Sequence, residues 1–201
     1  TLGKYLSEKN TKYQFHILTG DACLYIVNKQ PNGVCDLKSK QDFDKYVLNF
    51  ENSVFIYIGN LASKDYSTQY ELDVDINKTI LKLVEKNNYV LLVEQMPTFP
   101  FSVIDQYYAG VEWGEPILRN YDEWKNNERR LYIQRIYNKI NHPNVIKLST
   151  EKIFCDSFVK DECVGAFDDM IYFYDSNHIS IDGAELVGDE IFKEIDKVFS
   201  E

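Results

Sequence analysis

Apolar residues along this chain follow two different spacings. Short, nearly continuous apolar runs are typical of strands buried on both faces of a sheet, and they occur at residues 53–58, 89–93, 145–148 and 170–174, with a further short strand predicted at 13–18. Elsewhere apolar residues recur at helical spacing, which predicts helices at 1–9, 42–50, 75–87, 121–140 and 182–199, and a short helix at 101–108. This alternation predicts an α/β fold with a doubly wound parallel sheet.

The segments between these elements are predicted to be loops, at 19–38, 61–72, 98–116 and 150–168. Asp182 stands where a side chain would cap the last helix. We find no internal repeat and no interdomain linker, so we expect residues 1–201 to form a single domain. The sequence opens at Thr1 without a methionine, and we expect it to be an excised C-terminal part of a longer protein.

Composition narrows the function. The chain is 44% apolar, which is enough for a sizeable core, and its net charge is −10. A nucleic-acid-binding protein would show a basic stripe, so this class is excluded. No apolar run reaches 18 residues, so this stretch is not expected to cross a membrane by itself.

The cysteines form two sequence-local pairs, Cys23 with Cys35 and Cys155 with Cys163. Neither pair has the CxxC spacing of a zinc site, and the three histidines are scattered, so no metal site is predicted. Two local disulfides that tie down loops fit the pattern and imply an oxidising compartment. The alternative is four buried free thiols.

Candidate chemistry gathers in the last predicted strand and the loop after it. The run Ile171-Tyr-Phe-Tyr-Asp175 is followed three positions later by His178, and then by Gly183 and an amphipathic helix. An aspartate can hold an imidazole in one tautomer, and the imidazole can then take a proton from a hydroxyl nucleophile. The alternative is a strand-end aspartate that caps a turn, beside a surface histidine.

A strand followed by D-x-x-H-x-S-x-x-G-A and a final helix resembles the closing motif of the SGNH/GDSL hydrolases. The cysteine pair before FYDSNHISIDGAELV narrows the resemblance to SGNH domains fused behind membrane acyltransferases that O-acetylate cell-surface polysaccharides. The early cysteine pair and the strand followed by Glu94-Gln95-Met96-Pro97 also match that subfamily, so the resemblance covers essentially the whole chain.

The resemblance implies a three-layer α/β/α domain that moves an acetyl group to or from a carbohydrate hydroxyl through a serine acyl-enzyme. Asp175 would orient His178, and His178 would be the general base. No metal or organic cofactor is implied. The partners would be a carbohydrate acceptor, an acyl donor and an upstream transmembrane acyltransferase domain, which places this domain on the periplasmic or extracellular face.

The family's nucleophile lies in a Gly-Asp-Ser motif at the end of the first strand, and no such serine occurs in this sequence. In one register, Thr1 directly follows the motif. In the other, Gly20-Asp21-Ala22 is the motif, with Ala22 in place of serine. Pro31 and Gly33 prevent a full helix after Ala22, so we favour the first register, in which a helix and a strand follow as the fold requires.

Other residues are weaker candidates. Gly59 and Asn60 end a buried strand where the family has oxyanion donors, but a turn-forming Gly-Asn fits equally well. None of the possible substitute nucleophiles lies in a tight strand-to-helix elbow; they are Ser63, Ser102, Ser176 and Ser180. Several aromatic residues could form a shelf for a carbohydrate, although core positions are the more usual place for aromatics in such a chain; they are Tyr107, Tyr108, Trp113 and Trp124, with Phe99 and Phe101 beside them. His16 and His142 are expected to be structural.

Two other functions share this fold. The first is a stand-alone secreted carbohydrate esterase with the same machinery, which would differ in its acceptor. The second is a non-catalytic domain that binds carbohydrate or a protein partner and has lost the serine; the register with Ala22 would favour it. The ten residues before Thr1 would discriminate between the enzyme and the non-catalytic domain.

Overall fold

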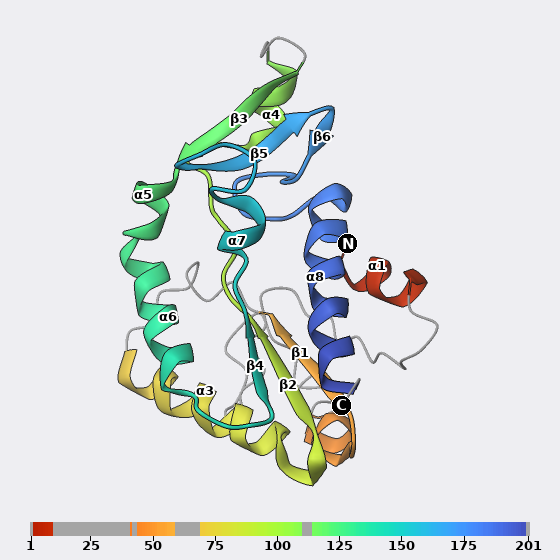
Figure 1. The fold of residues 1–201 in the computed structure, drawn as a ribbon. Helices are drawn as coiled ribbons and strands as arrows, with labels where there is room; N and C mark the ends of the chain where they lie inside the picture. Colours follow the sequence, from red (N-terminus) through yellow and green to blue (C-terminus); the bar gives the residue numbers. More distant parts are fainter. Residues whose placement is uncertain (1, 10–40, 42–43, 59–68, 110–113, 200–201) are drawn as a thin grey trace. The chain divides into compact units, whose positions relative to one another are not determined.

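The structure is a computed structural model that describes residues 2–9, 41, 44–58, 69–109 and 114–199 (Figure 1). The chain falls into two compact units. One comprises Thr1–Ile17, Met96–Arg130 and Ser149–Glu201, and the other comprises Leu18–Gln95 and Leu131–Leu148. We call them the first and the second unit and describe each by itself. The single domain expected from the sequence stays a prediction.

The second unit is built on a parallel sheet. Its strands are β1 (Val54–Ile58), β2 (Tyr89–Val93) and β4 (Val145–Leu148), in the order β1-β2-β4 (Figure 1). Val54 is paired with Tyr89, and Val90 is paired with Val145. The three apolar runs predicted to be strands are therefore strands, with ends that agree to within a residue, and the parallel sheet is confirmed.

Helices pack against this sheet through their apolar faces. They are α3 (Gln69–Leu83) and the C-terminal part of α6 (Glu128–Lys139), with the 3-10 helices η1 (Val47–Asn49) and η3 (Glu85–Asn87) at the edges. The core contains Ile76 and Ile80 from α3, Val90 and Leu92 from β2, and Ile136 from α6. The helix predicted at 75–87 is thus α3 followed by η3, and α3 already begins at Gln69, inside the segment predicted to be a loop. The backbone leaves the helical conformation within η3, where Lys86 has a φ of 58°.

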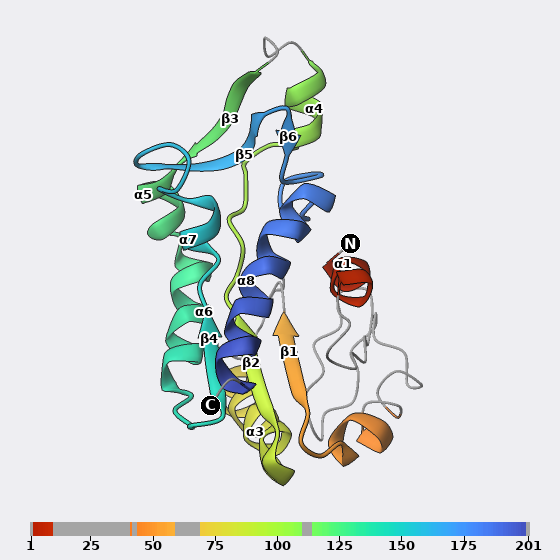
Figure 2. The same cartoon turned by 45° about the vertical axis from the view of Figure 1, so that its right-hand side comes forward.

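The first unit contains a second, antiparallel sheet that the sequence did not reveal (Figure 2). Its strands are β3 (Gly114–Asn120), β5 (Glu162–Asp168) and β6 (Met170–Ile171), in the order β3-β5-β6. Strand β5 lies within the segment 150–168 that was predicted to be a loop, and β3 begins inside the predicted loop 98–116 and extends beyond it. Small residues and a register shift explain the weak strand pattern: Gly165 lies in β5, and β3 has irregular pairing near Ile117.

The strand predicted at 170–174 is also different. Only Met170–Ile171 is a strand, and it pairs antiparallel with β5 across a turn in which Asp168 has a φ of 52°. Phe173 then forms a single bridge to Ile179. Tyr172 and Phe173 in the middle of this run are buried, whereas Met170 and Tyr174 at its ends are exposed. These residues lie in an antiparallel hairpin, so the expectation of a last parallel strand was wrong.

The helices of the first unit are α1 (Leu2–Lys9), α4 (Val103–Tyr108), α5 (Tyr121–Lys125), α7 (Glu151–Phe154) and α8 (Ile181–Phe199). The pattern predicted α1, α4 and α8, but α7 lies in the segment 150–168 that was predicted to be a loop. The single long helix predicted at 121–140 is wrong, because α5 ends at Lys125, with Asn126 as its C-cap, and α6 begins at Glu128. Asn127 caps the new start, since its Oδ1 accepts a hydrogen bond from the Arg130 N–H at 3.2 Å.

The last helix is capped by Ser180 and not by Asp182. The Ser180 hydroxyl oxygen accepts a hydrogen bond from the Gly183 N–H at 3.2 Å, and Asp182 lies inside the first turn. The Asp182 carboxylate instead accepts from the Ile171 N–H at 3.2 Å. The cap therefore lies two residues before the predicted one, and Asp182 ties the start of α8 to β6.

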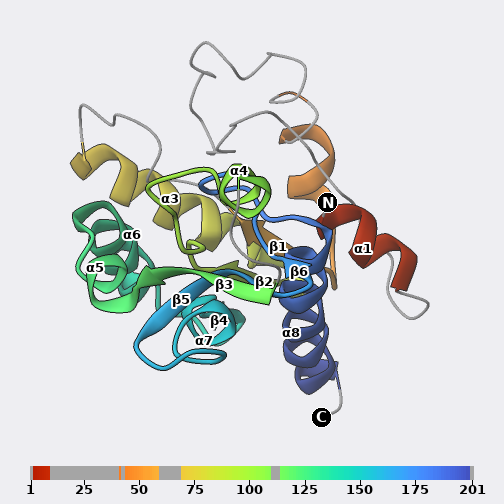
Figure 3. The same ribbon diagram turned by 90° about the horizontal axis from the view of Figure 1, so that it is seen from above.

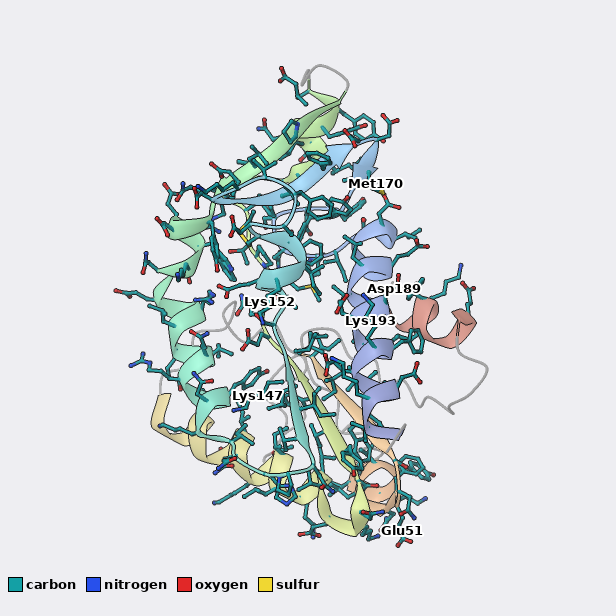
Figure 4. All side chains as sticks on the ribbon, in the orientation of Figure 1. Glu51, Lys147, Lys152, Met170, Asp189 and Lys193 are labelled. Carbon is teal, nitrogen blue, oxygen red and sulfur yellow. A yellow bond between two sulfur atoms is a disulfide. The ribbon has the colours of Figure 1, made fainter. Side chains whose placement is uncertain are left out.

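The helices α1 and α8 pack against each other (Figure 3). The Tyr5 hydroxyl donates a hydrogen bond to the Asp189 carboxylate, on the side of α8 that faces α1 (Figure 4). The Tyr5 ring lies directly on Gly188, where a Cβ atom would overlap the ring. Close approach of these two helices therefore depends on a glycine at position 188.

A disulfide joins Cys155, after α7, to Cys163 in β5. Both cysteines are buried and pack with Trp124, which is 1% exposed. The other predicted cysteine pair, Cys23 with Cys35, lies outside the described residues. The predicted strand at 13–18 lies outside them as well. Of the helix predicted at 42–50, residues 42 and 43 lie outside the described residues, Asp44 to Tyr46 are helical, and η1 follows them directly.

Candidate active site

A tight turn holds Asp175 and His178 between β6 and α8. The Tyr174 N–H donates to the His178 carbonyl oxygen at 2.7 Å, and Phe173 is bridged to Ile179 just outside this bond. The Ser180 N–H donates to the Tyr172 carbonyl oxygen at 2.9 Å, which closes the base of the turn. Asp175 and His178 are therefore presented on one hairpin, which the sequence predicted as a loop.

Both oxygens of the Asp175 carboxylate are engaged within this turn. Oδ1 accepts hydrogen bonds from the backbone N–H groups of Asn177 and His178, each at 2.8 Å, and Oδ2 lies 2.7 Å from His178 Nδ1. Partial burial raises the pKa of Asp175, but these hydrogen bonds outweigh burial and hold the pKa below its ordinary value. Asp175 is therefore an ionised carboxylate at neutral pH.

An ionised Asp175 determines the tautomer of His178. Because Oδ2 can only accept a hydrogen bond, Nδ1 carries a proton and donates it, so in the neutral ring Nε2 keeps its lone pair. The His178 side chain is 73% exposed, so the ring is accessible to a reacting group. This arrangement can take a proton from a hydroxyl and return it, as a general base and then a general acid.

The segment that leads into α4 supports the turn of Asp175 and His178 through backbone hydrogen bonds and a contact between aromatic rings. The Phe99 N–H donates to the Ser176 carbonyl oxygen at 2.7 Å, and the Val103 N–H donates to the Asp175 carbonyl oxygen at 3.4 Å. The Phe99 ring packs on Phe173, with centroids 5.1 Å apart. Sequence reasoning missed this support, because backbone groups make the contacts and no side-chain motif marks them.

The serines near the turn have structural partners. Ser180 caps α8 and also donates to the Ile171 carbonyl oxygen. Ser102 caps α4 by accepting from the Asp105 N–H at 3.4 Å, and Ser176 donates to Asn177 Oδ1 at 3.2 Å. These contacts agree with the expectation that Ser176 and Ser180 shape the turn, while Ser63 lies outside the described residues.

The proposed aromatic shelf is only partly at the surface. Trp124 is 1% exposed and Phe99 is 4% exposed, so both belong to the core and neither can be part of an exposed shelf. Tyr108 is exposed, and its ring packs edge-on against Tyr107 with centroids 5.5 Å apart. Tyr174 is also exposed, and it lies in the turn that carries Asp175 and His178, which we call the dyad turn. Trp113 lies outside the described residues.

The remaining sequence candidates are distributed as follows. Gly59 and Asn60 lie outside the described residues, as do Ala22 and His16, so their roles stay predictions. His142 lies in the turn before β4, where its Nδ1 accepts from the Asn144 N–H at 3.1 Å. Within the described part of the chain, no group of His, Cys, Asp or Glu side chains could hold a metal ion, and no helix there is long and apolar enough to cross a membrane.

Comparisons with known proteins give a family and a fold. A family model described as an SGNH domain fused to AT3 domains matches residues 3–193. Among solved structures, the chain is similar to the periplasmic domain of a lipopolysaccharide acetyltransferase of Salmonella ser. Paratyphi A, with a TM-score of 0.66 and 16% sequence identity, covering 96% of this chain and 77% of that chain. Comparison with curated protein sequences gives no match. The two matches confirm the α/β fold class of the SGNH type.

Proposed function

Since the chain belongs to the family of SGNH domains fused to AT3 domains, we propose that it moves an acetyl group to or from a carbohydrate hydroxyl through a serine acyl-enzyme. Membership of this family supports an acyltransferase or esterase role in general terms. The finer proposal rests on one observation, the 2.7 Å contact between Asp175 Oδ2 and His178 Nδ1. That contact prepares an imidazole to activate a hydroxyl.

In the proposed reaction, a serine Oγ attacks the acyl carbonyl carbon while His178 Nε2 takes the serine proton. The tetrahedral intermediate collapses, and His178 gives that proton to the departing oxygen of the donor. His178 then takes the proton of a carbohydrate hydroxyl, whose oxygen attacks the acyl-enzyme, and His178 returns that proton to the departing serine Oγ. If water replaces the carbohydrate in this last step, the same residues perform hydrolysis. The ionised Asp175 stabilises the imidazolium that forms in each step.

Two parts of this mechanism come from the sequence and the family resemblance. The nucleophile is a serine in a Gly-Asp-Ser motif in the segment preceding Thr1, in the register that we favour. The oxyanion is held by backbone N–H groups and by Asn60, following Gly59. Such donors stabilise the negative charge that develops on the acyl oxygen and contribute about 100- to 1,000-fold to the rate when present.

The proposed location is the periplasmic or extracellular face, tethered through an upstream transmembrane acyltransferase domain. The family's fusion to AT3 domains supports the tether. The Cys155–Cys163 disulfide supports an oxidising compartment. The matched Salmonella chain is named as a periplasmic domain of a lipopolysaccharide acetyltransferase, which is compatible with this placement and with a carbohydrate acceptor.

Acetate release from an acetyl ester by the full-length protein tests the proposal. We expect His178→Ala to lower turnover by about 100-fold or more, because it removes the general base. His142→Ala is the matched control and should retain turnover, since its ring lies in a structural turn. Unchanged turnover in His178→Ala would remove His178 from the mechanism. Adding a carbohydrate acceptor and measuring its acetylation then separates transfer from hydrolysis.

The sequence that precedes Thr1 tests the same proposal independently. A Gly-Asp-Ser motif there, followed by loss of turnover when its serine is changed to alanine, supports the acyl-enzyme. Without such a motif, and without acetate release by the full-length protein, the function is instead that of a non-catalytic binding domain. Gly20-Asp21-Ala22 would then be the degenerate motif.

A further inference from the structure

A row of hydrogen bonds connects the Arg119 guanidinium to the Asp175–His178 turn. Arg119 Nη1 donates to the Thr98 carbonyl oxygen and, at 3.0 Å, to the Thr98 hydroxyl oxygen. The Thr98 carbonyl and the Phe99 N–H belong to one peptide group, and this N–H donates to the Ser176 carbonyl oxygen at 2.7 Å. One planar peptide therefore joins Arg119 to the turn.

A second peptide group continues the row to the carboxylate. The Ser176 carbonyl and the Asn177 N–H belong to the same peptide, and this N–H donates to Asp175 Oδ1 at 2.8 Å. The other oxygen, Oδ2, is the one that contacts His178 Nδ1. A cation at one end of such a row polarises each peptide in turn, which strengthens the last N–H donor to the carboxylate.

Arg119 is held in place by strand pairing next to a disulfide and by an aromatic ring. It lies in β3 directly opposite Cys163, which carries the disulfide to Cys155. Its guanidinium lies 5.5 Å from the centre of the buried Trp124 ring, and this ring packs on the same disulfide. Movement of the guanidinium away from Thr98 is therefore opposed by stacking and by the strand.

The partly buried position of the Arg119 guanidinium is unfavourable for the stability of the fold if the residue serves only packing. Burial lowers the pKa of the Arg119 guanidinium, and attraction to the Glu123 carboxylate opposes that shift only in part. Within the described residues, Arg119 Nε is buried without a hydrogen-bond partner. A partly buried cation that ends on a backbone carbonyl is less stabilising than one paired with a carboxylate, so its position calls for a role beyond packing.

We propose that Arg119 is a positioning residue for the catalytic pair, acting through the Thr98–Phe99 and Ser176–Asn177 peptides to fix the Asp175 carboxylate against His178. This proposal rests on the proposed function, in which Asp175 and His178 activate a hydroxyl. Lysine cannot replace arginine here, because its ammonium lacks the planar group that stacks on Trp124 while donating to Thr98.

Two matched substitutions on the same aromatic ring test the proposal in the full-length protein. Arg119→Lys loosens the row, whereas Arg130→Lys makes the same chemical change next to Trp124 without touching Thr98. The Arg130 guanidinium lies 5.8 Å from the ring centre and donates to the Lys125 carbonyl oxygen and to Glu151. Arg119→Met removes the donors while keeping an apolar stem, and Thr98→Val removes only the hydroxyl acceptor.

We expect Arg119→Lys and Arg119→Met to lower kcat for acetyl-ester cleavage by roughly tenfold to a hundredfold, with KM within about twofold, because small displacements of a catalytic group cost rates of that order. The ¹H resonance of the His178 Nδ1 proton, assigned with His178→Ala, should shift or broaden in both variants. Arg130→Lys should lower the melting temperature but leave kcat per folded molecule within about twofold and that resonance in place.

The proposal is overturned if Arg119→Met keeps its kcat, or if it loses activity only in proportion to its folded fraction with an unchanged Nδ1 resonance. If Arg119→Met does not fold, Arg119→Lys and Thr98→Val decide the same question, with a smaller effect expected for Thr98→Val. Failure of the proposed function is recognised separately, because His178→Ala would then retain turnover. The Nδ1 resonance in the Arg119 variants would still show whether the row of hydrogen bonds positions His178.

Discussion

Gly183, in the first turn of α8, lies so close to the carbonyl oxygen of Tyr172 that a Cβ atom at position 183 would overlap it. The same carbonyl accepts the Ser180 N–H at 2.9 Å, at the base of the turn that carries Asp175 and His178. A Cβ atom would also lie 3.2 Å from the Ile179 side chain. Position 183 is therefore where the dyad turn and the last helix are packed backbone to backbone.

We expect Gly183→Ala to destabilise the protein by roughly 1–3 kcal/mol, because backbone must move to admit the methyl group. Acetyl-ester cleavage should fall as well, since the displaced carbonyl belongs to the dyad turn. Urea unfolding and turnover measure the two effects. Glu185→Ala, on the exposed face of the same turn of α8, is the control and should change stability by about 0.5 kcal/mol or less. Equal stabilities for the two variants would contradict the overlap.

The depressed pKa of Asp175 predicts a pH-dependent stability. A carboxyl whose pKa is lower in the folded state stabilises the protein above its unfolded pKa, near 3.8, and this contribution is lost as pH falls through the folded value. We compare wild type with Asp175→Asn, which cannot titrate. The stability difference in favour of wild type should be constant near neutral pH and should shrink below pH 3.8. Urea midpoints at a series of pH values measure it, and a difference independent of pH would contradict the assigned hydrogen bonds.

The pattern of apolar residues predicted the parallel sheet of the second unit well. Its strands are continuous apolar runs such as Tyr89–Val93, because residues buried on both faces of a sheet must all be apolar. The dyad turn could also be predicted, since an aspartate and a histidine three positions apart need only a tight turn to meet. Local spacing determined both features.

The antiparallel sheet could not be predicted in the same way. Strand β5 contains Gly165, at which a Cβ atom would lie only 2.8 Å from the Val103 side chain. The place of this glycine in a strand therefore depends on close packing with a residue distant in the sequence, which the local pattern does not show. The support given to the turn by Phe99 comes from a backbone N–H, which every residue other than proline has. Arg119 gave no signal for a related reason, because its acceptor Thr98 belongs to a segment whose path is determined by tertiary packing.

The disulfide should stabilise the first unit. Cys155 and Cys163 close a short loop beside the Trp124 ring, and we expect Cys155→Ala with Cys163→Ala to lower stability by about 2 kcal/mol or more. Thermal unfolding of this double variant and of wild type, each with and without a reductant, measures the effect. The predicted Cys23–Cys35 disulfide would also respond to a reductant, so the double variant is what isolates the contribution of Cys155 and Cys163. A melting temperature equal to that of wild type would show that the loop is held by packing alone.

The contact between α1 and α8 predicts an unusual tyrosine. Burial raises the pKa of Tyr5 from 10.0 to about 12, and its hydrogen bond to the Asp189 carboxylate adds to this effect. Since the folded pKa is the higher one, the resulting stabilisation is complete below pH 10 and is lost as pH rises towards about 12. The difference in tyrosinate absorbance between wild type and Tyr5→Phe should therefore appear near pH 12 and not near pH 10.

Gly188→Ala tests the same contact from the other helix. A methyl group at position 188 would overlap the Tyr5 ring, so α1 must move away from α8 or the ring must leave its site. Either movement exposes the Tyr5 hydroxyl and separates it from Asp189, and we expect the pKa of Tyr5 to return towards 10.0. The measurement is the difference titration of Gly188→Ala against the double variant with Tyr5→Phe. A tyrosine that still titrates near pH 12 in Gly188→Ala would mean that this close packing does not hold Tyr5.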